Sequence, residues 1–362
     1  MTRRRKNLTN PVVILGAGAT KACGGPLTNE ILSEVFTRRN DLYDPLALKP
    51  LEAFLIENFH LPKLDTDRRW EDYPPLPLLL SLIDLGRDRK EPFKPMKMHN
   101  AWYPESRSST GNSLASARRS LEYAISALLE NMLDKVNKPL LHSEMVTKIF
   151  PGNMPPKVIS FNYDIIIDKT LTDRTKNQND ADGTTLGIYP DYGCDITQKN
   201  SIEGQDGDSG LLLKLHGSLN WLYCPGCHRM EVRENKVAHN VATQPPCSEC
   251  GTKMQAVLIT PTYFKDYRNP HIAQIWYKAQ RLLRSADHVY FIGYSLPDDD
   301  VHITYLLKRS LAHLPANAMT VVEMDKCKRS LKDNPVGSRY RILFGDGIDW
   351  HPEGMEEWLT TL

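Results

Sequence analysis

A buried strand that ends in a histidine and is followed at once by a cysteine-rich module constrains this chain most. Residues 211–215 are four leucines and a lysine, and His216-Gly217 comes directly after them. Two C-x-x-C pairs follow: Cys224, Cys227, Cys247 and Cys250. Thiolates at this spacing can close the tetrahedral shell of one Zn²⁺ and leave no open position. The pattern therefore predicts a structural zinc module directly after a strand of the core.

Charge and hydropathy predict a soluble, cytoplasmic protein. The 45 lysines and arginines nearly balance the 44 acidic residues, which leaves a net charge of +1. Direct nucleic-acid binding through overall charge is not expected from that balance, although a local basic face is left open. No apolar run approaches the length of a membrane span. The basic residues 3–6 are not followed by an apolar core of the kind a signal peptide has.

Short apolar segments alternate with helical patterns along much of the chain. Strands are expected at 12–15, 157–161, 211–215, 257–260, 289–293, 320–324 and 341–344. Helices are expected after Thr28, which can cap the first of them, and at 51–59, 115–135, 272–284 and 301–314. Apolar strands separated by helices predict an α/β fold with a doubly wound parallel sheet covered on both faces.

Three units are expected. Segments 10–39, 156–222 and 255–350 would form the α/β domain. Residues 40–155 are rich in proline, contain a loop-like stretch at 107–113, and are interpreted as a helical insertion. Residues 223–254 would form the zinc module.

Polar or glycine residues follow five of the predicted strands. The five sets are Gly16-Ala17-Gly18-Ala19-Thr20, Asn162-Tyr163-Asp164, His216-Gly217, Gly293-Tyr294-Ser295-Leu296 and Glu323-Met324-Asp325. Ligands of doubly wound sheets bind at the carboxyl ends of the strands, so these sets are expected to converge on one crevice. Gly16 and Gly18 would let the backbone approach a phosphate closely.

Each set has a plainer alternative. A tight strand-to-helix turn without a ligand would also carry Gly16 and Gly18. Asn162 and Asp164 can form a turn or a cap, and Ser295 can cap a helix. His216 can be a structural histidine. Residues 298–300, three aspartates, suit the N-terminus of a helix better than a metal site.

Taken in order, most of these segments resemble the motifs of the sirtuin superfamily. Residues 16–20 look like its G-A-G-x-S loop, with Thr20 in place of serine. Residues 161–164 look like Q-N-x-D with Phe161 in place of glutamine, 216–217 like H-G, and 293–296 like G-T-S-L. The four cysteines match the zinc ribbon of that family. The resemblance covers most of residues 11–345 apart from the insertion, and it implies a Rossmann-like NAD-binding domain.

The resemblance also implies roles for individual residues. Asn162 would hold the nicotinamide ribose, Asp164 the nicotinamide carboxamide, and His216 would act as general base. Ser295 would contact a phosphate or the adenine ribose, and Glu323 or Asp325 a ribose hydroxyl. The implied cofactor-binding residues are Gly16, Ala17, Gly18, Ala19, Thr20, Asn162, Asp164, Gly293, Ser295 and Glu323. NAD⁺ would be the substrate and Zn²⁺ a structural metal held by the four cysteines.

Two departures from the family pattern bear on the activity. Residues 256–263 lack the F-G-E element with which deacylating sirtuins hold an acyl-lysine peptide. Residues 25–30 read G-P-L-T-N-E where those enzymes have G-I-P-D-F-R. The segments G-G-P-L-T, F-N-Y-D, K-L-H-G-S-L-N-W and G-Y-S-L-P-D-D-D resemble instead the bacterial sirtuin-like branch of antiphage defence.

The main hypothesis is an NAD⁺ glycohydrolase that releases nicotinamide and ADP-ribose as a regulated defence effector. Such an effector is expected to form a homo-oligomer or to act with an ATPase, nucleotidase or Argonaute partner. An NAD-dependent protein-lysine deacylase is the alternative, motivated by the retained zinc ribbon. A non-enzymatic subunit that binds NAD or ADP-ribose is the third, motivated by the large helical insertion.

Overall fold

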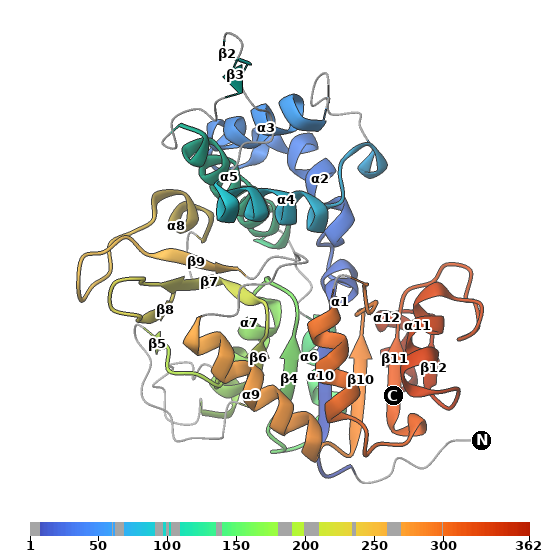
Figure 1. Cartoon of the computed structure of the whole chain (residues 1–362). Coiled ribbons are helices and arrows are strands. Elements are labelled where there is room, and N and C mark those ends of the chain that lie inside the picture. The colour runs from blue at the N-terminus through green and yellow to red at the C-terminus, as the bar shows by residue number, and fades with distance from the viewer. Residues whose placement is uncertain are drawn as a thin grey trace.

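The computed structural model describes most of the chain (Figure 1). The described residues are 8–59, 61, 69–90, 97–98, 101–102, 109–134, 140–179, 190–198, 210–233, 237–258, 269–298 and 300–362. They form a central sheet with helices on both faces, a smaller sheet beside it, and a separate layer of helices at the top of Figure 1. Among these residues no helix has both the length and the apolar character needed to cross a membrane.

The central sheet has six parallel strands in the order β12-β11-β10-β1-β4-β6. They are β1 (Pro11–Leu15), β4 (Lys157–Ser160), β6 (Leu211–Lys214), β10 (His288–Ile292), β11 (Met319–Val322) and β12 (Asp349–His351). When the six strands are numbered by their order in the chain and read across the sheet from the β6 edge, the order is 3-2-1-4-5-6. This is the strand order of a doubly wound Rossmann fold. The predicted fold class is confirmed, and the strand order reverses between β1 and β10.

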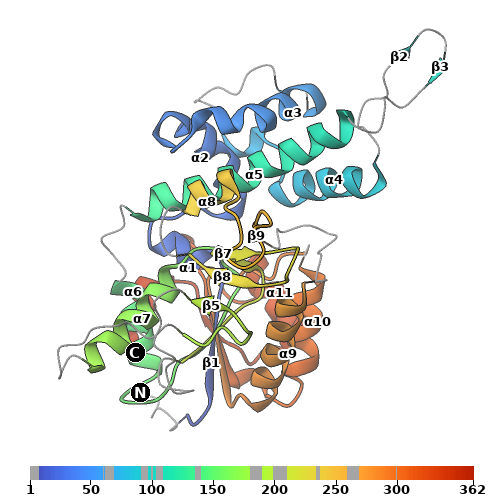
Figure 2. The ribbon, with the colours of Figure 1, turned by 90° about the vertical axis from the view of Figure 1, so that its left-hand side faces the viewer.

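Helices cover both faces of the sheet (Figure 2). One face carries α9 (Pro270–Ser285), α10 (Val301–Ser310) and α11 (Pro335–Phe344). The other carries α1 (Ala17–Ala22), α6 (Leu140–Ile149), α7 (Ile166–Asn179) and α12 (Met355–Thr361), which contacts α1 and α6. Right-handed crossovers place helices on opposite faces when the direction of strand addition reverses, as it does here.

The layer at the top of Figure 1 has its own apolar core. It contains α2 (Ile31–Thr37), α3 (Lys49–Phe59), α4 (Leu76–Arg89) and α5 (Ser109–Asp134), with the short helices η1 (Thr28–Glu30), η2 (Arg39–Asp41), η3 (Pro45–Leu48) and η4 (Trp70–Asp72). A fifth short helix, η5 (Ala316–Ala318), precedes β11, and strands β2 (Lys97–Met98) and β3 (Ala101–Trp102) pair with each other. The buried residues of α2 belong to this core, whereas those of α6 belong to the core of the sheet. We therefore propose that the inserted helical unit comprises α2 to α5 and excludes α6.

Helix α5 begins earlier than the predicted 115–135. Its first turns, from Ser109, occupy part of the stretch 107–113 that was expected to be a loop, and residues 107–108 lie outside the described residues. Serine, threonine and glycine lower helix propensity but do not exclude a helix that continues into a strongly apolar face.

The second sheet contains β5 (Thr197–Gln198), β8 (Met230–Val232), β7 (Gly217–Tyr223) and β9 (Gln255–Leu258), in the order β5-β8-β7-β9. The prediction that residues 257–260 add a strand to the parallel sheet is wrong, because β9 pairs antiparallel with β7. An apolar run cannot by itself reveal which sheet it joins. Helix α8 (Val237–Thr243) leaves this sheet and packs against α5, which connects the cysteine module with the helical layer.

The prediction of a strand at 341–344 is also wrong, because these residues end helix α11. Their apolar run suggested a strand, but Asn334 and Pro335 upstream begin a helix. The Asn334 side chain accepts hydrogen bonds from the N–H groups of Val336 and Gly337 at 2.8 and 3.1 Å. The true edge strand, β12, contains Asp349, Trp350 and His351, which carry too little apolar character to indicate a strand.

A glycine at the junction of the two sheets offers a test of this architecture. Gly217 has φ +80°, and a Cβ built there would lie 1.9 Å from the carbonyl oxygen of Val257 in β9. We expect Gly217→Ala to lower the free energy of unfolding by about 3 kcal/mol or more, because β7 and β9 must separate. Gly152→Ala is the matched control, since Gly152 has φ +64° and open space around it.

The control should cost only the left-handed backbone strain, about 1–2 kcal/mol. Urea unfolding measures both variants, and equal losses would contradict the close packing of β7 on β9.

Candidate active site

The main chain following β1 crosses that following β10 at the point where the strand order reverses. The Gly18 N–H donates to the Gly293 carbonyl at 2.8 Å, and the Gly16 N–H donates to the Ile292 carbonyl at 3.0 Å. A Cβ on Gly18 would lie 2.6 Å from the Gly293 Cα, and a Cβ on Gly293 2.3 Å from the Ala19 nitrogen. Packing of one backbone on another therefore requires glycine at both positions, independently of any phosphate.

The residues after β4 bond to this crossing. The Asn162 side-chain amide donates to the Gly16 carbonyl at 2.8 Å. Asp164 accepts from the Thr20 hydroxyl at 2.5 Å with one carboxylate oxygen and from the Ile166 N–H at 3.0 Å with the other. Asp164 thus forms the expected turn before α7, and it also fixes the side chain of Thr20. The structure brings the first two predicted sets together.

A buried lysine, which the sequence reasoning missed, supports that turn. Lys214, the last residue of β6, is fully buried, and its ammonium donates to the Asp164 carbonyl at 2.6 Å and to the Asp168 carboxylate at 2.9 Å. The Tyr192 hydroxyl donates to the other Asp168 oxygen at 2.6 Å. Burial raises the pKa of Tyr192 well above its usual value, so Tyr192 remains a donor. A lysine within an otherwise apolar strand was the available signal.

His216 lies directly after β6 and is buried beside Asp300 and Phe161. Its Nε2 is 3.7 Å from the Asp300 carboxylate, and its ring lies 5.5 Å from that of Phe161. Phe161 packs on Tyr294 with ring centroids 4.4 Å apart, and the Tyr294 hydroxyl donates to Asp300 at 2.9 Å. Phe161, which stands where the resembled motif has glutamine, therefore forms an apolar wall beside the imidazole.

The sequence predicted the position of Asp300 at a helix start correctly, but it did not reveal the role of the carboxylate beside His216. Asp300 does occupy the N-cap of α10, as expected, but its carboxylate makes no capping hydrogen bond. The side chain is only 4% exposed and points instead towards His216 and Tyr294. Of its neighbours, Asp298 is exposed and residue 299 lies outside the described residues. The order of the strands, which the sequence does not state, brings Asp300 beside His216.

The acidic residues after β11 have different surroundings. Asp325 accepts from the Arg329 side chain at 2.8 Å and from the Asn334 amide at 2.9 Å, which lowers its pKa. Burial raises the pKa of Glu323 to about 7, and its Oε2 is buried without a hydrogen-bond partner among the described residues. Asp325 is thus used in holding its own loop, and Glu323 is the carboxyl group that remains for a ligand.

Ser295 follows Gly293 at the same edge, as predicted, but it does not cap α10. Its carbonyl accepts two hydrogen bonds from the Arg339 guanidinium of α11, at 2.9 and 2.7 Å. These bonds fix the β10–α10 turn, in which Leu296 has φ +48°.

Residues 25–30 lack the Phe-Arg pair of the resembled motif, and an ion pair and a hydrogen bond of Glu30 hold this segment instead. The Lys21 ammonium lies 2.8 Å from the Glu30 carboxylate, which also accepts from the Leu27 N–H at 2.8 Å. Glu30, and not Thr28 as predicted, therefore satisfies the start of the helical turn η1. Of the segment 256–263, Ala256, Val257 and Leu258 belong to β9, and residues 259–263 lie outside the described residues.

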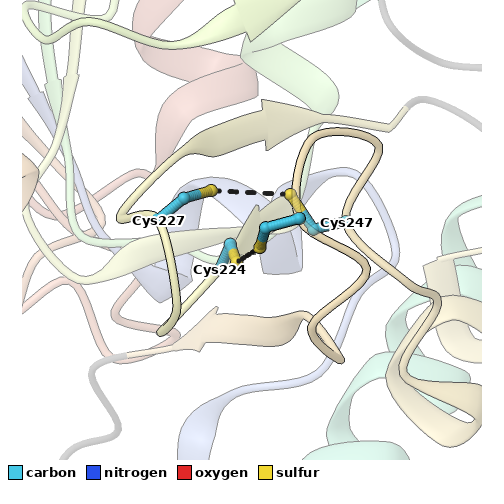
Figure 3. Close-up of side chains that lie close together, drawn as sticks. Cys224, Cys227 and Cys247 are labelled. Carbon is cyan, nitrogen blue, oxygen red and sulfur yellow. Dashed lines mark hydrogen bonds between the residues drawn. The ribbon is translucent and has the colours of Figure 1, made fainter.

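The four cysteines meet at the tip of the second sheet (Figure 3). Their sulfur atoms all lie within 4.8 Å of one another, with Cys224 and Cys250 at 3.4 Å and Cys227 and Cys247 at 3.6 Å. Tight turns present each pair, and the residues that follow, His228 and Gly251, have φ +63° and +71°. The prediction that the four cysteines come together is confirmed.

This cluster fits a zinc ion. Four thiolates bound at about 2.3 Å in a tetrahedron have sulfur atoms separated by about 3.8 Å, close to the observed distances. Cys224 and Cys247 are buried with Leu222 and Met254 in a small apolar cluster, which would shield the metal from water on one side. The four side chains would fill the coordination shell, so the metal would be structural.

The comparisons with known proteins agree with this picture at the level of family. The model of the SIR2-like domain matches residues 156–334, which include β4, β6, the cysteine module and α10. The chain therefore carries a SIR2-like domain over these residues. Among the curated proteins, none matches this chain.

Three solved structures illustrate the distance to characterised members. A mutant Sir2 homologue with 2′-O-acetyl-ADP-ribose has 12% identity and a TM-score of 0.47, covering 98% of this chain and 92% of that one. A Sir2 homologue with NAD has 13% identity and a TM-score of 0.46, covering 98% and 89%. Another mutant Sir2 homologue with ADP-ribose has 12% identity and a TM-score of 0.44, and the match covers 98% of this chain and 92% of that one. Such low values carry no information on activity, which has to be inferred from this chain's own geometry.

Removal of the metal provides a test of the cysteine module. We expect about one zinc per chain in the purified protein, and we expect chelation to increase hydrogen exchange over residues 222–256. Cys247→Ser should release the metal, whereas Cys327→Ser, at an exposed cysteine outside the module, should retain it. Metal analysis by mass spectrometry distinguishes the two, and carefully purified protein without zinc would contradict the assignment.

The buried carboxyl group of Glu323 predicts a pH dependence of stability. Its pKa in the folded protein, about 7, exceeds its ordinary value, so the folded state holds an extra proton between the two values. Stability should therefore fall as the pH rises from about 4.5 to 7. Glu323→Gln should remove that dependence and stabilise the protein by roughly 1–3 kcal/mol at pH 8. Denaturant unfolding across this range measures it, with exposed Glu356→Gln as the control.

Proposed function

We propose that the chain is an NAD⁺ glycohydrolase that cleaves the nicotinamide–ribose bond and releases nicotinamide and ADP-ribose. The observation that carries the proposal is the convergence of Gly16, Asn162 and His216 at the carboxyl edge of a doubly wound sheet. A SIR2-like domain with these polar groups in place supports chemistry at the ribose of a dinucleotide.

The proposed reaction is a displacement at the anomeric carbon. The bond between that carbon and the nicotinamide nitrogen breaks, and its electron pair remains on the nicotinamide. A water oxygen bonds to the carbon, one of its protons passes to His216, and the other stays on the new hydroxyl group of ADP-ribose. The leaving group is good, so orientation and electrostatics supply most of the rate enhancement.

Individual residues would divide the work. Asn162, fixed by the Gly16 carbonyl, would hold the ribose and the attacking water. Asp164 would bind the carboxamide with lone pairs not used by Thr20 and Ile166, and Glu323 would accept from the adenine ribose. The loop from Gly16 to Thr20, with Gly293 and Ser295, would line the phosphates. The Gly18 and Ala19 N–H groups already donate to main-chain carbonyls, so any phosphate would share them.

Asp300 would act as a positioning residue for His216. A carboxylate close to an imidazole favours the tautomer and orientation suited to proton transfer, and it stabilises the imidazolium that forms. The Tyr294 hydroxyl holds the second oxygen of Asp300 and so limits its rotation.

Two features favour water over acyl-lysine as the acceptor. Residues 256–263 lack the peptide-binding element, and Glu30 pairs with Lys21 where deacylating sirtuins carry a Phe-Arg that shields the ribose. We further propose a cytoplasmic, regulated effector of antiphage defence, active as a homo-oligomer or with an ATPase, nucleotidase or Argonaute partner. The helical unit α2 to α5, with its own core, is the surface proposed for that regulation.

Product analysis tests the reaction. The protein is incubated with NAD⁺, with and without an acetyl-lysine peptide, and the products are identified by mass spectrometry. Nicotinamide and free ADP-ribose without peptide would support the glycohydrolase. Acetyl-ADP-ribose formed only with peptide would support the deacylase instead, and tight NAD⁺ binding without turnover in every assembly state would support the non-enzymatic subunit.

Two substitutions separate the proposed roles of His216 and Asp300. His216→Ala should abolish hydrolysis, because it removes the proposed general base. Asp300→Asn should lower kcat by about 10- to 100-fold with little change in KM, since it would act through His216. Asp298→Asn, at the exposed neighbouring position, is the control and should leave both constants unchanged. Hydrolysis by His216→Ala at the wild-type rate would refute the mechanism.

A further inference from the structure

The helices on one face of the central sheet carry basic residues and no acidic ones. Of these helices, α9 and α10 contact each other, and the Lys308 ammonium of α10 donates to the Leu343 carbonyl of α11. Their 36 residues include Lys278, Arg281, Arg284, Lys308, Arg309, Arg339 and Arg341. In a chain with 44 acidic residues among 362, average composition would place about four in a stretch of that size. The net charge of +1 therefore hides a local positive face.

The helices on the opposite face of the sheet do carry acidic residues. They include Glu144 in α6, Asp173 in α7, and Glu356 and Glu357 in α12, together with the cations Lys148, Lys169 and Arg174. The opposite face thus carries both signs, whereas the α9–α11 face has an excess of positive charge, and a local excess attracts anions even when the total is near zero. An anionic partner would be drawn to the α9–α11 face.

Two exposed tyrosines stand on this positive face. Tyr277 of α9 is 61% exposed and Tyr305 of α10 is 64% exposed. Each is followed four residues later by an arginine, and the Arg281 and Arg309 guanidinium carbons both lie 6.0 Å from the ring centroids. The same Tyr–Arg pair thus recurs on two helices that contact each other. Large exposed aromatic side chains commonly mark binding surfaces.

Several cations of the face are already engaged within the protein. Lys278 lies 4.0 Å from Asp191, the Lys308 ammonium donates to the Leu343 carbonyl, and Arg339 donates to Ser295. Arg281, Arg284 and Arg309 are exposed, and no carboxylate among the described residues lies within ion-pair distance of them. These three guanidinium groups are therefore the ones that a ligand can use.

We propose that Tyr277, Arg281, Arg284, Tyr305 and Arg309 form a binding surface for single-stranded nucleic acid. Guanidinium groups would neutralise phosphates, and unstacked bases would lie on the two tyrosine rings, as in other surfaces of this composition. Duplex DNA hides the faces of its bases and would leave the tyrosines unused. A polyglutamate segment would meet the arginines but offers no planar groups to the two rings.

The test uses the full chain and fluorescently labelled oligonucleotides of about 20 nucleotides, poly(dT) and poly(U), in a fluorescence anisotropy titration. We expect binding at about 50 mM salt that weakens with a log–log slope near −2, which corresponds to about three phosphates. Tyr277→Ala and Tyr305→Ala should each weaken binding by about fivefold or more. Comparison of the two oligonucleotides identifies DNA or RNA as the preferred strand.

Matched variants decide the site. Arg281→Glu with Arg309→Glu should reduce affinity by about tenfold or more, whereas Lys169→Glu, exposed on α7 of the opposite face, should leave it unchanged. All these positions are exposed, and unchanged thermal unfolding confirms that the variants fold. Absence of binding, equal loss with Lys169→Glu, or tighter binding of a polyglutamate peptide or of duplex DNA would overturn the proposal.

Discussion

The crossing of two main chains at the reversal of strand order is the constraint on which the rest of the site depends. The turns after β1 and β10 approach so closely that neither Gly18 nor Gly293 has room for a Cβ. The crossing positions the Gly16 carbonyl, which in turn holds the amide of Asn162. It also brings the β10 turn, with Tyr294 and the Asp300 that follows, to the side of His216. Two glycine contacts thus determine where the side chains of four strands meet.

A buried ion pair holds the turn that carries Asp164. Lys214 would be costly to bury alone, but its ammonium has the Asp168 carboxylate and the Asp164 carbonyl as partners. Replacing a single member would leave an uncompensated charge in the core, so the turn that carries Asp164 is held in one geometry. The strand order, the crossing of the two main chains and the buried ion pair therefore act together to position the side chains of the site.

The sequence allowed prediction of features that depend on local pattern. The apolar runs of β1, β4, β6, β10 and β11, the glycine turns and the cysteine pairs are of this kind. Features that depend on tertiary packing were missed or misread. The strand order brings Asp300 to His216, the burial of Lys214 depends on Asp168 and Tyr192, and β9 joins a sheet that no apolar run specifies. The apolar run at 341–344 was predicted as a strand because the helix to which it belongs begins far upstream, at the Asn334 cap, ten residues before the helix ends.

Helix α8 lies between the two cysteine pairs in the sequence, and in the fold it packs on α5. Val241 of α8 joins the core of the helical layer, and His239 contacts the Tyr43 hydroxyl at 3.1 Å. A metal that orders the cysteine turns therefore also restrains the helix that fastens the layer. By thermodynamic reciprocity, a partner that stabilised the docked layer would raise the affinity for zinc, and loss of zinc would weaken that partner. Zinc binding and the docking of the helical layer are thus coupled, because both depend on the ordering of helix α8.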